Sequence, residues 1–219
     1  MTTFKTKILP IITILLIFLF WYSSLSVSYL VMIVPMLFVL LVSYVEFKSN
    51  FLKQLGFSSS NFNKKNILIH APLIAFGLFL IYYYVLLPLL TYITNQPIDY
   101  SDFDAVKGNP VSLIFLLLFV WISAAFGEEI VWRGYFMKQF AKFFGDGKIS
   151  MTINILLFGI LFGLMHSYQG ITGQLLTGII GMILSYIFYK KKYDLWLNVA
   201  IHGWFDTIAI LALYFNLGQ

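Results

Sequence analysis

The sequence predicts an all-α membrane protein, a polytopic bundle of about seven transmembrane helices. The first observation is composition, because 60% of the 219 residues are hydrophobic and only 11% are charged, whereas soluble domains are about a quarter charged. The second is a series of apolar runs, most of them near the roughly 20 residues that cross about 30 Å of hydrocarbon. The third is a strong bias of lysines towards alternate connections between these runs, as the positive-inside rule requires.

Seven apolar runs are the candidate transmembrane helices. They are Ile8–Leu25, Ser28–Val45, Ile67–Tyr92, Val111–Phe136, Met151–Met165, Gly173–Tyr189 and Leu195–Phe215. The fifth and sixth runs are shorter than a full crossing. The stretch from Glu46 to Asn66 alternates apolar residues with lysines, which predicts an amphipathic segment lying on the membrane surface.

The first run resembles a signal peptide at its start, where Lys5 and Lys7 precede an apolar stretch. Trp21 and Tyr22 stand where the small residues of a cleavage site would be, and a second apolar run follows at once. We therefore interpret this run as a retained first helix.

The lysines also predict an orientation in the cell membrane. If the N-terminus is cytoplasmic, lysines fall in every cytoplasmic connection. These are Lys5, Lys7, Lys48, Lys53, Lys64, Lys65, Lys138, Lys142, Lys148, Lys190, Lys191 and Lys192. Only Lys107 falls outside, in a loop with Asp99, Asp102 and Asp104. The distribution predicts a multi-pass protein with a cytoplasmic N-terminus and an external C-terminus, in contact with membrane lipids and not with nucleic acid.

The chain is expected to form one integral membrane domain. Residues 1–110 supply N-terminal transmembrane helices and the interfacial segment, and residues 111–219 carry the buried polar groups. Cysteine is absent, which excludes disulfides, thiolate catalysis and cysteine-ligated metals.

Glu128, Glu129 and Arg133 place charge inside the fourth run. Charge at membrane depth costs several kcal/mol unless it is paired or hydrated, so it usually marks function. Glu129 and Arg133 are four residues apart and share one helical face, where they can neutralise each other. Glu128 is rotated about 100° away on an α-helix and needs a different partner.

Two later runs offer such partners at helical spacing. Phe162 and His166 lie one turn apart in the fifth run, and His202 and Asp206 lie one turn apart in the seventh. Three helices can thus present polar groups to one cavity between the fourth, fifth and seventh spans.

A carboxylate and an imidazole that face one water form a general-base pair. The water could attack an amide carbonyl, and His202 could donate to the resulting oxyanion while Asp206 fixes the tautomer of its ring. These residues predict an intramembrane peptidase that activates water and uses no covalent nucleophile.

The same residues form an ordered pattern, Glu128-Glu129-x-x-x-Arg133, then Phe162-x-x-x-His166, then His202-x-x-x-Asp206. In this the chain resembles the CAAX-protease and bacteriocin-processing family of intramembrane proteases, which includes the type II CAAX prenyl endopeptidase. The resemblance covers roughly Val111 to Leu213 and marks residues 111–219 as the catalytic core.

The resemblance implies that Glu128 and His166 activate the water and that His202 and Asp206 line the oxyanion site. Glu129 and Arg133 would hold the architecture of the site, and Phe162 would pack against His166. The implied substrate is a membrane-associated peptide or a lipidated protein. The implied roles are maturation of peptide signals or bacteriocins, or self-immunity.

Asp206 departs from the eukaryotic form of the family, which has Asn at this position. An ionised Asp has no proton to donate, so Asp206 is protonated, or orients His202, or binds a metal. A glutamate mechanism without a metal cofactor is favoured. If a metal is present, Glu128, His166, His202 and Asp206 would form an oxygen and nitrogen ligand set for Zn²⁺, although no His-Glu-x-x-His signature occurs.

Two other functions fit the composition. The first is a non-catalytic membrane scaffold or immunity protein of the same fold. The second is a small transporter whose buried Glu and His residues relay protons. The transporter is disfavoured because the sequence shows no internal repeat and no broken helix pair.

Overall fold

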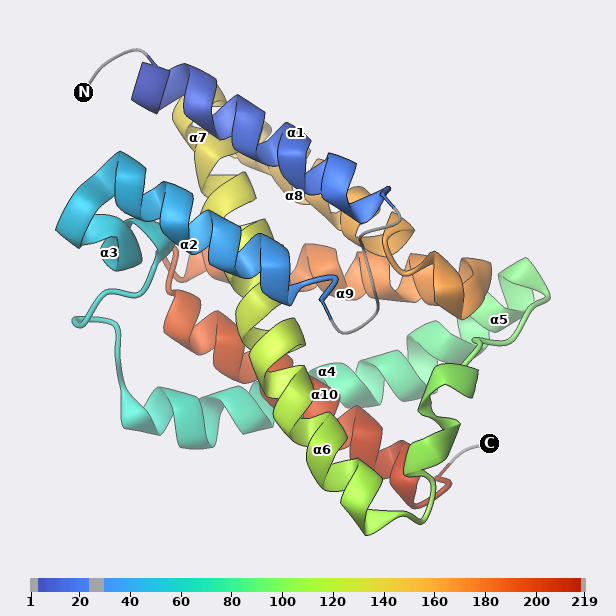
Figure 1. Cartoon of the computed structure of the whole chain (residues 1–219). Helices are drawn as coiled ribbons and strands as arrows, with labels where there is room; N and C mark the ends of the chain where they lie inside the picture. Colours follow the sequence, from blue (N-terminus) through green and yellow to red (C-terminus); the bar gives the residue numbers. More distant parts are fainter. Residues whose placement is uncertain (1–3, 24–29, 218–219) are drawn as a thin grey trace.

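The computed structural model describes residues 4–23 and 30–217, which form helices and connections without any β-strand (Figure 1). The α-helices are α1 (Leu9–Trp21), α2 (Ile33–Phe47), α3 (Phe51–Leu55), α4 (Ala71–Ile81), α5 (Leu87–Thr94), α6 (Pro110–Val120), α7 (Lys138–Phe144), α8 (Lys148–Leu164), α9 (Gly170–Lys190) and α10 (Leu195–Tyr214). The predicted all-α fold class is confirmed.

Other helical segments join these elements. Wider π-helical turns form η1 (Phe4–Ile8), η3 (Asn66–His70), η4 (Tyr82–Leu86) and η6 (Trp121–Met137). Tighter 3₁₀ turns form η2 (Lys48–Asn50), η5 (Ser101–Val106) and η7 (Ser167–Gln169). Several of these segments run on without a break into neighbouring α-helices.

Within the described ranges, five continuous helices are long and apolar enough to cross a membrane. They are Ile33–Leu55, Asn66–Thr94, Pro110–Phe144, Ser167–Lys190 and Leu195–Tyr214. Two shorter apolar helices, Thr6–Trp21 and Lys148–Leu164, stand where the first and fifth runs were predicted. The sixth helix is longer than the sequence indicated, because helical structure begins before Gly173. The predicted ends of the first two spans, at residues 25 and 28, lie outside the described residues.

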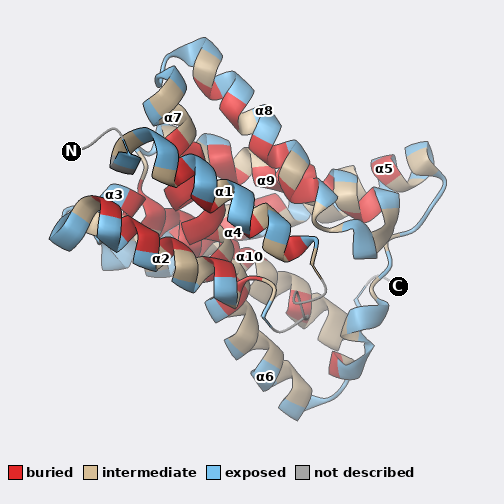
Figure 2. Ribbon diagram, turned by 45° about the horizontal axis from the view of Figure 1, so that its top comes forward, coloured by how far each residue is buried: buried red, intermediate tan, exposed pale blue. Residues whose placement is uncertain are grey.

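A long helix, Pro110–Phe144, passes through the centre of the bundle, and we call it the motif helix. It consists of α6, η6 and α7, and it contacts α2 and α10 (Figure 1). The buried residues gather around η6, where every residue from Glu129 to Met137 is buried (Figure 2). The polar motif therefore occupies the most enclosed part of the structure.

The hydrogen-bond register of η6 differs from the expected α-helix. The turns are of the wider i to i+5 type, a geometry found frequently at functional sites. The motif residues keep their order around the helix, but the angle between Glu128 and Glu129 is not that of an α-helix.

Helices α8 and α9 approach each other closely through small residues. A Cβ atom added to Gly163 would lie 3.0 Å from the Cα atom of Gly178 and still closer to the carbonyl oxygen of Gln174. Only glycine allows the two backbones to meet in this way, as the small-xxx-small spacing of Gly159 and Gly163 indicates.

We expect Gly163→Ala to lower the free energy of unfolding by about 1–3 kcal/mol, because the added methyl group meets backbone atoms that cannot turn aside. Thermal unfolding in detergent would measure the loss. Gly77→Ala is the matched control, since its Cβ would have no heavy atom within 4 Å. Equal melting temperatures for the two variants would contradict the close approach of α8 and α9.

Candidate active site

Arg133 is fully buried, and its side chain contacts residues of three helices. Its side chain is 1% exposed and that of Glu129 is 0% exposed, and Nη1 donates to Glu129 Oε1 at 2.9 Å. Nη2 donates to the carbonyl oxygen of Gly181 at 2.8 Å, and Nε donates to Ser185 Oγ at 3.3 Å. The guanidinium carbon lies 4.8 Å from the centre of the Phe162 ring, a cation–π distance. The motif helix is thereby fixed to both α8 and α9.

Glu129 accepts hydrogen bonds from α10 as well as from Arg133. Asn198 Nδ2 donates to Oε2 at 2.7 Å, and His202 Nδ1 lies 2.9 Å from Oε1. Asn198 and His202 are four residues apart and share one face of α10. Glu129 is therefore the common acceptor of three donors, and not the partner of Arg133 alone.

Asn198 was not among the residues singled out from the sequence. The spacing does point to it, because Asn198, His202 and Asp206 follow one another at intervals of four residues and so share one helical face. Its amide oxygen is buried without a hydrogen-bond partner in the described part of the protein. The residue is thus held in place through its amide nitrogen and Glu129.

The second ring nitrogen of His202 faces two further carboxylates. Nε2 lies 3.9 Å from Glu128 Oε2 and 3.4 Å from Asp206 Oδ2. The side chains of His202, Glu128 and Asp206 are 8%, 14% and 22% exposed, so this side of the ring is accessible while the Glu129 side is sealed.

Glu129 and Asp206 face opposite nitrogens of the His202 ring, and the role of Asp206 in fixing the tautomer stays a prediction. An ionised carboxylate only accepts hydrogen bonds, so Glu129 favours a proton on Nδ1, and an ionised Asp206 would favour a second proton on Nε2. Asp206 lies beside Nε2, on the opposite side of the ring.

His166 lies just beyond the end of α8, not within a helical turn, because α8 ends at Leu164. Its Nδ1 hydrogen-bonds to the carbonyl oxygen of Phe162 at 2.8 Å, and the two rings are 4.8 Å apart. The ring is within electrostatic range of His202 and Arg133. Nε2 is left as the nitrogen that can accept a proton.

Tyr168 is a second residue that the sequence did not indicate. Its ring lies 5.8 Å from that of His166, and its phenol is within electrostatic range of Glu128 and Asp206. The backbone N–H of Asp99 donates to the carbonyl oxygen of Gln169 at 3.2 Å. The acidic connection between α5 and α6 thus reaches the turn that carries His166.

The proposed zinc ligands do not form a metal-binding cluster. Among the residues that the structure describes, no three His, Asp or Glu side chains are placed to hold one ion. His166 and His202 each commit Nδ1 to a protein acceptor. Both rings keep Nε2 available, as metal-ligating histidines usually do, so the zinc ligand set stays a prediction.

Two cavities lie near the motif helix, and neither is lined by the candidate catalytic residues. One, of about 420 Å³, is almost wholly apolar. Its lining residues are Phe62, Lys64, Ile67, Leu68, Trp121, Phe126, Trp196, Val199 and Ala200. The other, of about 360 Å³, lies at the α7 end of the motif helix.

A family model described as type II CAAX prenyl endopeptidase Rce1-like matches residues 110–208. The matched range begins with the motif helix and includes Glu128, Arg133, His166, His202 and Asp206. No curated protein and no solved structure matches the chain. In residues 110–208, the protein is similar to the Rce1-like family of CAAX-type proteases.

Proposed function

We propose that this protein is an intramembrane endopeptidase in which Glu128 activates water to hydrolyse a membrane-associated peptide or lipidated protein. The observation that carries the proposal is the meeting of Glu128 and His202. Their facing atoms are 3.9 Å apart, and the far side of the His202 ring is fixed by Glu129. Residues from separate helices thus lie within the range that one bridging water can span, as proton transfer requires.

In the first step, Glu128 takes a proton from water as the water oxygen attacks the carbonyl carbon of the substrate. The free Nε2 of His166 is the second group that can hold this water, because Nδ1 is engaged by Phe162. The carbonyl π electrons move to oxygen and form a tetrahedral oxyanion.

In the second step, His202 donates from Nε2 to the oxyanion. Glu129 and Asp206 place negative charge on both sides of this ring, which balances the charge of an imidazolium donor. Collapse of the intermediate breaks the C–N bond, and the proton held by Glu128 passes to the leaving nitrogen. The products are a carboxylate and an amine, and no step requires a metal cofactor.

We propose a multi-pass arrangement of seven helices in the cell membrane, with the N-terminus cytoplasmic and the C-terminus outside. The five long helices would be joined by Thr6–Trp21 and Lys148–Leu164, which rise about 24 and 26 Å at 1.5 Å per residue. Local thinning of the bilayer accommodates helices of this length. Substrates would reach the carboxylates between the fourth, fifth and seventh spans.

We further propose that the physiological substrate is a peptide signal or a bacteriocin precursor, or that cleavage confers self-immunity. The alternative is a non-catalytic membrane scaffold or immunity protein of the same fold. The endopeptidase requires the accessible polar residues for its function, whereas the scaffold does not.

The experiment is a cleavage assay with the full chain in liposomes, using a library of membrane-inserted peptides, first with a zinc chelator and then with zinc restored. We expect hydrolysis, with one oxygen from labelled water in the new carboxylate, and its loss in His166→Ala. A scaffold would give no cleavage, and its host phenotype would tolerate His166→Ala. Cleavage that appears only when zinc is restored would overturn the metal-free mechanism.

Asn198→Ala is expected to lower kcat roughly tenfold with little change in KM. A hydrogen bond to a charged group contributes about 1.5–3 kcal/mol, and here it orients the carboxylate that fixes His202. Asn154→Ala is the control, because this equally buried amide bonds to the carbonyl oxygen of Met137, away from the site. If both variants lose stability but neither changes kcat, Asn198 has no positioning role.

A further inference from the structure

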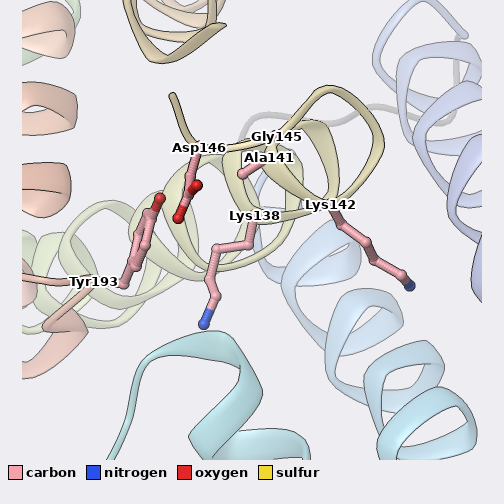
Figure 3. Close-up of a pocket in the computed structure, with 6 residues that line it drawn as sticks. All are labelled: Lys138, Ala141, Lys142, Gly145, Asp146 and Tyr193. Carbon is pink, nitrogen blue, oxygen red and sulfur yellow. The ribbon is translucent and has the colours of Figure 1, made fainter. Parts of the chain in front are cut away.

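The cavity at the α7 end of the motif helix is separate from the candidate active site. Its volume is about 360 Å³, and its walls come from α7, from the turn that follows it and from the connection between α9 and α10 (Figure 3). The lining residues are Lys138, Ala141, Lys142, Gly145, Asp146 and Tyr193. None of them takes part in the proposed peptidase mechanism.

Two opposite charges face this cavity without pairing to any described residue. Lys142 is neutralised, because its ammonium forms an ion pair with buried Glu46. Lys138 and Asp146 are absent from the ion pairs of the described chain. They do not reach each other although they line one cavity. Figure 3 shows the Asp146 carboxylate near Tyr193 and the Lys138 ammonium extending away from that carboxylate.

Lys138 is half-buried, so its lack of a carboxylate partner has a cost in free energy. Its ammonium lies 5.6 Å from the centre of the Tyr193 ring, which gives it only a cation–π contact. A half-buried cation and a nearby carboxylate that stay apart complement a ligand that carries both charges.

The backbone that presents Tyr193 is held in an unfavourable conformation. Lys192 and Tyr193 are consecutive non-glycine residues with φ of 56° and 64°, each costing roughly 1 kcal/mol or more. Such strain persists where the surroundings impose it and often marks functional sites. The surroundings here include Gly56, where a Cβ would lie 2.6 Å from the carbonyl oxygen of Tyr193.

The Tyr193 hydroxyl adds a hydrogen-bond donor to the cavity. Burial, with a smaller contribution from the carboxylate of Asp146, raises the pKa of Tyr193 to about 12. The phenol is therefore protonated at neutral pH. The cavity thus offers a cation on one part of its wall and a hydroxyl donor beside a carboxylate acceptor on another.

We propose that this cavity binds the phosphoethanolamine headgroup of a membrane lipid, with its phosphate on Lys138 and its ammonium on Asp146. In the proposed orientation the cavity opens at the cytoplasmic membrane surface, close to the lysines after α9, and basic pockets between membrane helices on that side bind lipid headgroups. The proposal rests on that orientation and not on peptidase activity.

A lipid in this place would brace the two helices that carry the catalytic groups. Lys138 begins α7, the last part of the motif helix, and Tyr193 precedes Asp194, which caps α10 by accepting from the Leu197 N–H at 3.2 Å. The headgroup would therefore hold the C-terminal end of η6 and the N-terminal end of α10 together, on the α7 side of Glu129 and His202.

The experiment measures lipid retention by the full chain in detergent, using native mass spectrometry and competition between phosphatidylethanolamine, phosphatidylcholine and phosphatidylglycerol. We expect phosphatidylethanolamine to be retained most. Lys138→Gln should weaken its binding at least about fivefold, the increment of one lysine near an anionic group. Asp146→Asn should remove the preference for ethanolamine over choline, whose quaternary nitrogen has no N–H to donate. Lys53→Gln, which removes an exposed lysine of α3, should change nothing.

Free phosphoethanolamine distinguishes the source of the headgroup. Competition at millimolar concentration would show that the site recognises the headgroup alone, and failure to compete would assign recognition to the intact lipid. Stronger retention of phosphatidylglycerol by the wild type would overturn the proposal, as would an equal effect of Lys53→Gln and Lys138→Gln. If Lys138→Gln does not fold, the exposed Asp146→Asn decides, because an unchanged lipid preference in that variant also overturns it.

Discussion

Glu128→Gln should reduce peptide hydrolysis by about 10²–10⁴-fold, the usual contribution of a general acid–base group, and should leave the helical bundle folded. The amide has nearly the shape of the carboxyl group but cannot take a proton from water. The Glu128 side chain is 14% exposed, and its Oε2 atom lies 3.9 Å from Nε2 of His202. Removing its charge therefore orphans no close hydrogen-bond donor, and the melting temperature should remain within a few degrees of the wild type.

Turnover in liposomes and thermal unfolding in detergent would measure the two effects on one preparation. Asp104→Asn is the matched control, since it neutralises a carboxylate that is 61% exposed and forms a surface ion pair with Lys107. We expect wild-type turnover from this control. Wild-type turnover from Glu128→Gln would show that water is activated by another residue.

The sequence predicts that the two adjacent glutamates have different partners, and it identifies those partners only in part. Four-residue spacing indicates the pair of Glu129 with Arg133 because it depends on one helix alone. The contacts of Arg133 with Gly181 and Ser185 depend on how α9 packs, and nothing in the sequence of α9 marks these residues as polar partners. Close helix packing explains their small size equally well.

The position of His166 shows a similar limit. The spacing from Phe162 predicts one helical turn, but α8 ends two residues before His166. The next glycine, Gly170, has a φ of 73°, which glycine adopts readily and other residues do not. The glycine can therefore indicate a helix end near residue 170. It does not indicate that His166 itself lies outside the helix.

The role of the N-terminal helices also lay beyond the sequence, which shows no motif before residue 110. Trp21 of α1 stacks on Trp132 of η6 at 5.3 Å, and Glu46 of α2 accepts from Gln139 at 2.9 Å. These contacts join distant parts of the chain, so they follow from tertiary packing and leave no periodic pattern. Helices α1 and α2 thus form one wall of the space that encloses η6.

Arg133→Met should cause the largest loss of stability, about 3–5 kcal/mol, because it leaves the fully buried carboxylate of Glu129 without its cation. For a chain of this size the melting temperature should fall by about 10 °C. Lys107→Met provides the comparison, since exposed ion pairs contribute at most about 1 kcal/mol. Thermal unfolding of detergent-solubilised protein measures both variants.

The double variant Glu129→Gln/Arg133→Met separates loss of charge balance from loss of packing. Removing both partners leaves no uncompensated charge, so the double variant should regain much of the stability lost by Arg133→Met alone. It should not regain activity, because a glutamine at position 129 no longer provides the negative charge that balances a protonated His202. A double variant no more stable than the single one would mean that Arg133 acts through its contacts with α8 and α9. Recovery of stability without recovery of turnover would instead show that the same carboxylate serves both the fold and the catalytic ring.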